Sequence, residues 1–181
     1  MNREEALELL NEHVKTKNLN KHMLAVEACM RSLAGRLGEN PDEWAIAGLL
    51  HDLDYDQTVN DFPRHGFVTE ELLKDKGISP KIIDAIKAHT GHTPIVNNMD
   101  LALYAIDPVT GLIVAAGLMH PTKKLANVDV QFIMKRFKEK RFAAGANREQ
   151  IRKCEGLGLA LEEFVGICLA AMQGIAGELG L

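Results

Sequence analysis

The sequence predicts an all-α protein, folded as a single compact multi-helix bundle. Apolar side chains recur every three or four residues along most of the 181-residue chain, and no convincing pair of strands is present. Aromatic residues make up only 5% of the chain, whereas Ala, Leu, Met, Glu and Lys, which favour helix, are abundant. Because no linker, repeat or low-complexity tract interrupts this pattern, we expect one domain over residues 1–181.

Three helices are expected within the first fifty residues. The first carries apolar residues at helical spacing up to Val14, and the second begins at a capping Asn18 or Asn20 and stops at Gly38. The third opens at residues 40–43, where a capping asparagine precedes a first-turn proline and two acids that favour the positive helix end. Its apolar run ends in an adjacent histidine and aspartate.

The middle of the chain predicts a polar loop and three further helices. Residues 55–63 lack apolar periodicity and are expected to form the loop, which leads into a helix over about 64–76. Ser79-Pro80 begins the next helix, which runs to His89. After another loop, a long apolar helix over about 99–119 is expected, and Pro108 should kink or divide it.

The last third of the chain predicts three helices beyond Pro121. A basic helix is expected near 128–140, a short helix near Asn147 and an apolar helix over about 157–179. The glycines of the last helix do not form a phosphate-binding loop, because no strand precedes them and no Lys-Ser/Thr pair follows.

Composition and charge exclude several classes of protein. The formal net charge of −4 provides no general basic field for grasping nucleic acid. Cys29, Cys154 and Cys168 are odd in number and widely spaced, which argues against a disulfide framework or a thiolate zinc site and favours a reducing cytoplasm. The acidic N-terminal segment makes export unlikely, and the longest apolar tract, Leu112 to Met119, is too short to cross a bilayer.

Polar residues with metal-binding side chains fall at expected helix ends or beside loops. Imidazole and carboxylate groups suit divalent ions such as manganese, iron, nickel, cobalt or zinc. His51 and Asp52 are adjacent, and where a helix unwinds two consecutive side chains can reach one ion. The complete set of these residues is His22, His51, Asp52, His65, His89, His92 and Asp107.

The sequence around these residues resembles the HD superfamily of metal-dependent phosphohydrolases. The matching motifs are His22 in NKHMLAVEACM, His51-Asp52 in AGLLHDLDYD and Asp107 in ALYAIDP, while His65 and His89 resemble two further histidines of members with two metals. The resemblance implies an HD-domain bundle with its metal-site core over about 21–108 and C-terminal helices over about 121–181. Leu53-Asp54 replaces the Ile-Gly of the HDIG subgroup, so no substrate is carried over from that subgroup.

The resemblance further implies that the site binds one or two divalent metal ions. The candidates are manganese, iron, nickel, cobalt, zinc and magnesium. His22, His51, Asp52 and Asp107 would hold the first ion, and Asp52 would bridge to a second ion held by His65 and His89. His51 and Asp52 would then form the catalytic pair, with metal-bound hydroxide as the nucleophile that cleaves a small phosphate ester. Two ions against two carboxylates leave a positive site for phosphate.

Basic residues downstream are candidates for binding that phosphate. Lys123, Lys135 and Arg136 are expected to bind the substrate, although a solvated helix face is the alternative interpretation of this basic cluster. The expected partner is a small phosphorylated metabolite or a nucleotide, with no duplex nucleic acid and no membrane. For Asp54 and Asp56, hydrogen bonds to the metal ligands and capping of a turn remain as alternatives.

Two other functions remain open at this point. Some HD relatives use a six-ligand di-iron site for oxygen-dependent oxidation, and the His65 and His89 matches permit a di-iron HD-type oxygenase. A regulatory HD module that binds a nucleotide without turnover is the second alternative. Either function would leave the expected fold and the location of the metal ligands unchanged.

Overall fold

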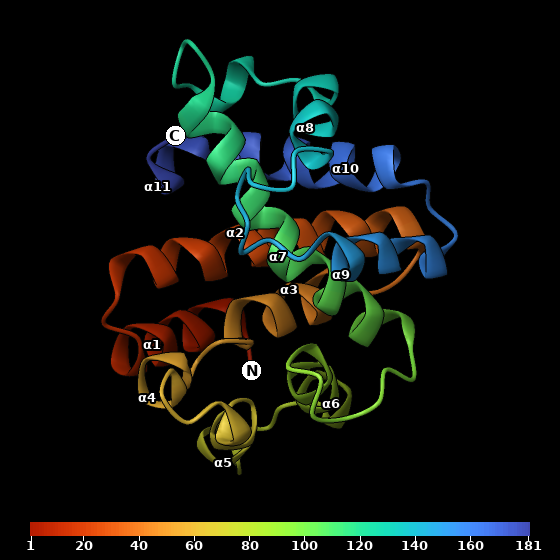
Figure 1. Ribbon diagram of the computed structural model, residues 1–181. Coiled ribbons are helices and arrows are strands. Elements are labelled where there is room, and N and C mark those ends of the chain that lie inside the picture. Colours follow the sequence, from red (N-terminus) through yellow and green to blue (C-terminus); the bar gives the residue numbers. More distant parts are fainter.

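Helix α7 (Asn98–Met119) runs through the centre of the computed structural model, which describes all 181 residues, and the other helices surround it (Figure 1). It packs against α2, α6 and α9, and its buried face belongs to the single hydrophobic core cluster. It is also the one helix whose length and composition would allow it to cross a membrane, although 56% of its most apolar window is buried inside the protein. The segment thus lies at the centre of the core.

Helices and turns account for all the regular structure, and no strand is formed, which confirms the predicted all-α class. The remaining elements are α1 (Arg3–His13), α2 (Lys17–Leu37), α3 (Pro41–Leu50), α4 (Tyr55–Thr58), η1 (Phe62–Arg64), α5 (Phe67–Leu73), α6 (Pro80–His89), η2 (Leu125–Asn127), α8 (Val130–Phe137), α9 (Arg148–Arg152), η3 (Lys153–Leu157), α10 (Leu161–Gly174) and α11 (Ala176–Leu179).

Helix α3 lies along α2, and the two backbones come unusually close. Asn40 caps α3 as predicted, accepting hydrogen bonds from the backbone N–H groups of Asp42 and Glu43. A Cβ atom on Gly48 would lie 2.9 Å from the carbonyl oxygen of Val26, so only glycine fits at this contact. Because every residue of α3 from Trp44 to Leu50 is buried, the helix delivers the residues that follow it to a fixed place.

Pro108 does not divide α7, contrary to one of the expected outcomes. A proline removes the hydrogen bond to the carbonyl four residues earlier, which here belongs to Tyr104. The side chain of Gln150, at the start of α9, donates a hydrogen bond of 2.8 Å to that carbonyl. A residue far along the chain thus satisfies the carbonyl that the proline leaves without a backbone donor.

Several predicted helix boundaries differ from those observed. The second helix begins after Thr16 rather than at Asn18 or Asn20, where Asp56 accepts hydrogen bonds from the backbone N–H groups of Lys15 and Thr16. The Thr16 hydroxyl also donates to Asp56, so it does not cap the helix. The predicted loop contains the short α4, and the helix predicted over 64–76 is shorter. Gly66 has a φ of +82°, which separates η1 from α5.

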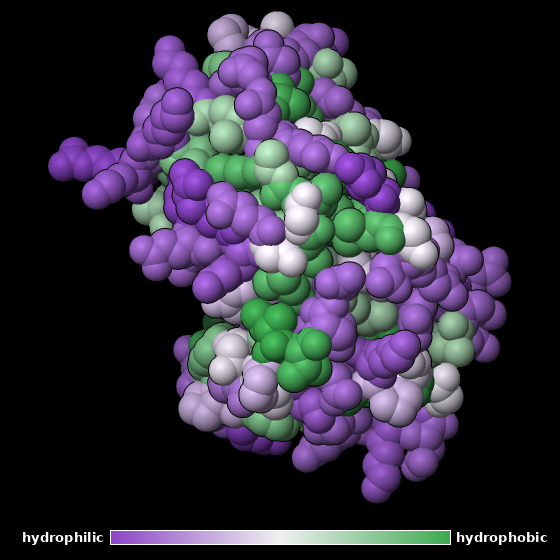
Figure 2. All heavy atoms as spheres, turned by 90° about the vertical axis from the view of Figure 1, so that its right-hand side faces the viewer, coloured by the Kyte–Doolittle hydropathy of each residue, from purple (hydrophilic) through white to green (hydrophobic).

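The C-terminal third is also more segmented than predicted. Helix α8 is shorter than the predicted basic helix over 128–140. The last apolar segment is divided into α10 and α11 instead of forming one helix over 157–179, and Gly158 adopts a φ of +77° before it. On the face shown in Figure 2, hydrophilic side chains cover the upper and lower parts, while apolar side chains reach the surface in the middle.

Candidate metal centre

Four histidines and two aspartates from separate segments meet at the C-terminal end of α3. His51 directly follows α3 and Asp52 is the next residue, so the buried helix places both. The other four side chains come from three helices and a turn: His22 from α2, His65 from the residue after η1, His89 from the end of α6 and Asp107 from the middle of α7.

One part of the cluster joins His22, His51 and Asp107. Nε2 of His22 lies 3.1 Å from Oδ1 of Asp107 and 3.2 Å from Nε2 of His51. Asp52 approaches the same group, with its Oδ2 atom 3.4 Å from Nε2 of His51. The donor atoms of His22, His51 and Asp107 all lie within 4.8 Å of one another, a spacing that one ion can bridge.

The other oxygen of Asp52 faces the remaining two histidines. Its Oδ1 atom lies 3.2 Å from Nε2 of His65 and 3.4 Å from Nε2 of His89. The two oxygens of one buried carboxylate thus point toward different sets of imidazoles. This is the arrangement by which a carboxylate can bridge two ions.

Hydrogen bonds on the far side of the rings determine which nitrogen carries the proton. Nδ1 of His51 contacts the carbonyl oxygen of Gly48 at 2.8 Å, and Nδ1 of His89 contacts that of Ile86. A carbonyl oxygen only accepts hydrogen bonds, so each Nδ1 donates. The Nε2 atoms of His51 and His89, which face the centre, therefore carry lone pairs when the rings are neutral.

The same reasoning applies to the other two histidines. The hydroxyl of Thr110 donates to the carbonyl oxygen of Asp107, so its oxygen is free to accept from Nδ1 of His22 at 3.1 Å. Nδ1 of His65 donates to the carboxylate of Asp54 at 2.8 Å. Four imidazole lone pairs and two carboxylates then converge without an intervening donor, and such a donor set fits divalent cations.

Burial and neighbouring charges shift the pKa values of these groups in opposite directions, and the shifts of His51, Asp52 and Asp107 favour the form that binds metal. Burial lowers the pKa of His51 to about 4, so its ring is neutral near pH 7. Burial raises the pKa of Asp52, but the neighbouring His51 and hydrogen bonds with His65 and His89 outweigh it and lower this pKa well below its usual value. For His65, burial lowers the pKa, but Asp52 and Asp54 raise it more, to about 9. A proton on His65 would thus compete with a metal ion.

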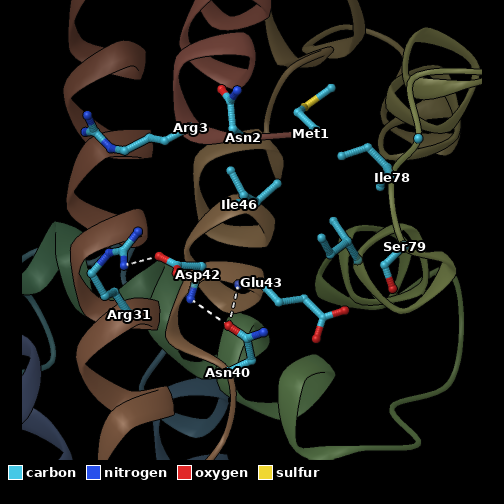
Figure 3. A pocket seen from close by; sticks show the side chains of 12 residues that line it. Met1, Asn2, Arg3, Arg31, Asn40, Asp42, Glu43, Ile46, Ile78 and Ser79 are labelled. Carbon is cyan, nitrogen blue, oxygen red and sulfur yellow. Dashed lines mark hydrogen bonds and ion pairs between the residues drawn. The ribbon is translucent and has the colours of Figure 1, made fainter.

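The cluster lies at the base of a cavity of about 460 Å³, which is also lined by Tyr55, Phe62, Tyr104 and Gln150. A larger cavity of about 590 Å³ lies beside the N-terminal end of α3 (Figure 3). There Arg31 pairs with Asp42, as Figure 3 shows, so these charged groups satisfy each other. Only the smaller of these two cavities contains the grouped metal-binding side chains.

The expected basic residues do not line this cavity. These residues are Lys123, Lys135 and Arg136. Arg136 instead forms an ion pair with Glu139 at 2.8 Å, and its guanidinium lies over the ring of Phe132. Their role in substrate binding stays a prediction. The segment after α8 lies near two of the candidate ligands, because Ala143, Gly145 and Ala146 border a hollow that His22 and Asp107 also line.

Several residues near the site were missed or left open by the sequence. Thr110 and Gln150 were missed, although the position of Thr110 three residues after Asp107 on a helix places both side chains on one face. Asp54 contacts His65 and also accepts from two backbone N–H groups, so both of its alternative roles apply. His92 lies outside the groups of ligand atoms, which include His89, and its Nδ1 contacts the carbonyl oxygen of His65 at 3.1 Å.

Comparison with known proteins adds a family and a group of relatives. The sequence model of the HD domain family matches residues 20–116. Ribonuclease Y of Geotalea uraniireducens is 32% identical over 96 residues, which cover 53% of this chain and 18% of the relative. Ribonuclease Y of Geobacter sulfurreducens is 31% identical over 96 residues, with the same two coverages. The chain spans about a fifth of the length of these relatives, and no solved structure matches it significantly.

These relatives correct one expectation. The expected partner was a small phosphorylated metabolite or a nucleotide, with no duplex nucleic acid, and this is wrong, because the relatives carry the name of an RNA-cleaving enzyme, which points to RNA. The physical reason for the error is that a net charge of −4 describes the whole chain. It says nothing about the local charge of a cavity in which metal ions would offset the carboxylates.

Proposed function

The chain belongs to the HD domain family, which matches more than half of it, and from this premise we propose that it is a metal-dependent phosphohydrolase that cleaves phosphodiester bonds of RNA. The observation that carries the proposal is the position of Asp52. One oxygen of this carboxylate faces His51, and the other faces His65 and His89. Two divalent ions held on either side of Asp52 would give a positive site for a phosphate.

The chain's own residues would hold and orient the ions. His22, His51, Asp52 and Asp107 would hold one ion, and His65 and His89 would hold a second one with Asp52 between them. A bound divalent ion lowers the pKa of water to about 7 to 9, which supplies a nucleophile near neutral pH. Water then adds to phosphorus while the bond from phosphorus to one ribose oxygen breaks, and that oxygen leaves with a proton.

The cavity supports an RNA strand as substrate rather than a rigid duplex. Its volume of about 460 Å³ is in the range of sites that take a single small-molecule-sized group. Tyr55, Phe62 and Tyr104 line it, and aromatic side chains bind unpaired bases by stacking. The names of the relatives favour RNA as the substrate class, and the cavity is large enough to hold a nucleotide beside the cluster.

The experiment begins with metal analysis of protein purified without chelator, followed by cleavage assays on end-labelled single-stranded RNA with each candidate ion. Asp52→Ala should lose bound metal and lower the cleavage rate by more than about 100-fold while the helical circular dichroism is kept. Asp84→Ala is the matched control, because Asp84 is an exposed acid on α6 that lies away from the cavity.

Four results would overturn the proposal. One is wild-type turnover in Asp52→Ala, and another is the absence of RNA cleavage with every ion tested. Oxygen consumption that requires iron, without phosphodiester cleavage, would favour the di-iron oxygenase instead. Binding of RNA without turnover under all conditions would favour a binding module.

A further inference from the structure

Three aromatic rings from three segments meet beside the metal cavity, which one of them, Phe62, lines. Phe62 lies in η1, Phe67 begins α5 and His92 follows α6. The rings of Phe67 and His92 are stacked, with centroids 5.5 Å apart and planes 17° apart. Phe62 lies 5.2 Å from the ring of His92. We call Phe62, Phe67 and His92 the aromatic rim.

The exposure of this rim is unusual within the protein. Of the six phenylalanines, only Phe62 and Phe67 are exposed, at 51% and 38%, and the other four are buried or half-buried. Large apolar side chains that gather in one exposed patch often mark a binding site, whereas single exposed apolar residues are common on any protein surface. Phe62 also lines the metal cavity, so part of its ring faces the space where substrate would enter.

The rim is tied to the metal cluster through one residue. The ring of Phe62 lies 5.5 Å from the ring of His65, whose Nε2 atom faces Asp52. Nδ1 of His92 contacts the carbonyl oxygen of the same His65. Because His65 is buried and held by Asp54, the rim keeps a fixed position relative to the centre of the cluster.

We propose that the exposed ring of Phe62, supported by His92 and Phe67, stacks a nucleobase of the RNA strand whose phosphate lies at the metal cluster. The inference rests on the proposed function, since it assigns a binding site to the base next to the phosphate that would be cleaved. A flat aromatic face beside a phosphate site fits a nucleotide, which carries both groups on one ribose. Stacking of this kind accepts any base, because every base has a π face.

The test uses the full chain and RNA oligonucleotides that contain 2-aminopurine, whose fluorescence falls when it stacks on an aromatic ring. Quenching is measured by rapid mixing of the RNA with metal-loaded protein, before cleavage, and KM and kcat are measured separately with the same enzyme. Phe62→Ala and Phe62→Leu should lose the fluorescence quenching and raise KM by about 10- to 100-fold with little change in kcat. Phe62→Trp should restore both properties, since it keeps an aromatic face.

Val96→Ala is the matched control, because Val96 is an apolar residue that is 77% exposed and does not line the cavity. Equal quenching and equal KM in Phe62→Ala and wild type would overturn the inference, as would full rescue by leucine, which has volume without a π face. If wild type cleaves no RNA with any ion, the proposed function fails, and the quenching measurement still decides whether Phe62 stacks a base.

Discussion

The carboxylate of Asp54 accepts a hydrogen bond from Nδ1 of His65 at 2.8 Å, and both side chains are buried. The second oxygen of Asp54 accepts from the backbone N–H groups of Gly66 and Thr69 at 2.8 and 3.0 Å. One side chain thus starts α5 and orients a ring of the metal cluster. The carboxylate requires a proton on Nδ1, so the lone pair of His65 is on Nε2, toward Asp52.

The first prediction concerns this proton. In Asp54→Asn, the amide oxygen can keep the two backbone donors, and the amide N–H₂ then faces Nδ1 of His65. The ring must accept there, which moves its proton to Nε2 and blocks metal binding. We expect the affinity for the ion that His65 and His89 would hold to fall by about 10- to 100-fold, measured by competition with a chelator. An unchanged affinity for both ions would contradict this role for Asp54.

The contact between α2 and α3 gives the second prediction. Gly48→Ala places a Cβ atom 2.9 Å from the carbonyl oxygen of Val26 and 3.0 Å from the Cα atom of Glu27, and neither backbone atom can move freely. We expect the free energy of unfolding to fall by about 1 to 3 kcal/mol in urea titrations. Gly35→Ala is the control, because Gly35 is helical with nothing within 4 Å of its added Cβ. This variant should equal or exceed wild type in stability; equal losses in both variants would contradict the packing argument.

The sequence could predict those parts of the fold that depend on local signals. The start of α3 follows from a cap, a proline and two acids that are contiguous in the chain, and it was predicted correctly. The donor that satisfies the Tyr104 carbonyl in α7 could not be predicted, because it is Gln150, which lies 46 residues beyond that carbonyl. The break before α5 likewise depends on Asp54, which binds backbone groups 12 and 15 residues away.

The candidate site shows the same division. The motif pattern named six side chains, and the structure brings all six together, although their roles as ligands stay predictions. The pattern could not place Lys123, Lys135 and Arg136, because their positions depend on how the last third of the chain packs. Net charge misled the choice of substrate for a related reason, since it averages over positions that only folding separates.

The third prediction concerns pH. Asp56 joins α4 to the turn before α2, accepting hydrogen bonds from the backbone N–H groups of Lys15 and Thr16 at 2.7 and 3.0 Å and from the Thr16 hydroxyl at 2.7 Å. The bond from the Thr16 hydroxyl, together with the backbone bonds, lowers the pKa of Asp56. A lowered folded-state pKa gives stability that is present above the unfolded value of about 4 and is lost as pH falls through the folded value.

Asp56→Asn should therefore be less stable than wild type at pH 7, by no more than about 1 kcal/mol because the site is exposed. The difference between the two proteins should shrink as the pH is lowered below about 4. Urea titrations of both proteins at pH 7, 5 and 3 measure this difference, and protonation of the metal cluster affects both proteins alike. A difference that grows in acid would have the wrong sign for this interaction.

The last prediction concerns the segment beside the metal ligands, which Arg148 holds together. Nη1 of Arg148 donates to the carbonyl oxygens of Ala143 and Ala146 at 2.7 and 2.6 Å, and its other nitrogens contact the carbonyl oxygens of Phe137 and Phe142. Ala143 has a φ of +44°, which alanine rarely adopts, so these bonds hold a strained turn in place. Lysine cannot reproduce this pattern, because its three donors radiate from one atom.

We expect Arg148→Lys to lower the free energy of unfolding by about 2 kcal/mol and to speed tryptic cleavage after Lys140 and Arg141 more than cleavage elsewhere. Arg152→Lys is the matched control, since Arg152 is an exposed arginine of the same helix whose ion pair with Glu155 is 3.5 Å long. Its stability and cleavage rate should stay close to wild type. If Arg148→Lys keeps the segment as resistant to trypsin as wild type, the turn holds without the guanidinium. The position of this turn beside His22 and Asp107 would then depend on the packing of Phe142, Ala143 and Ala146 against the core.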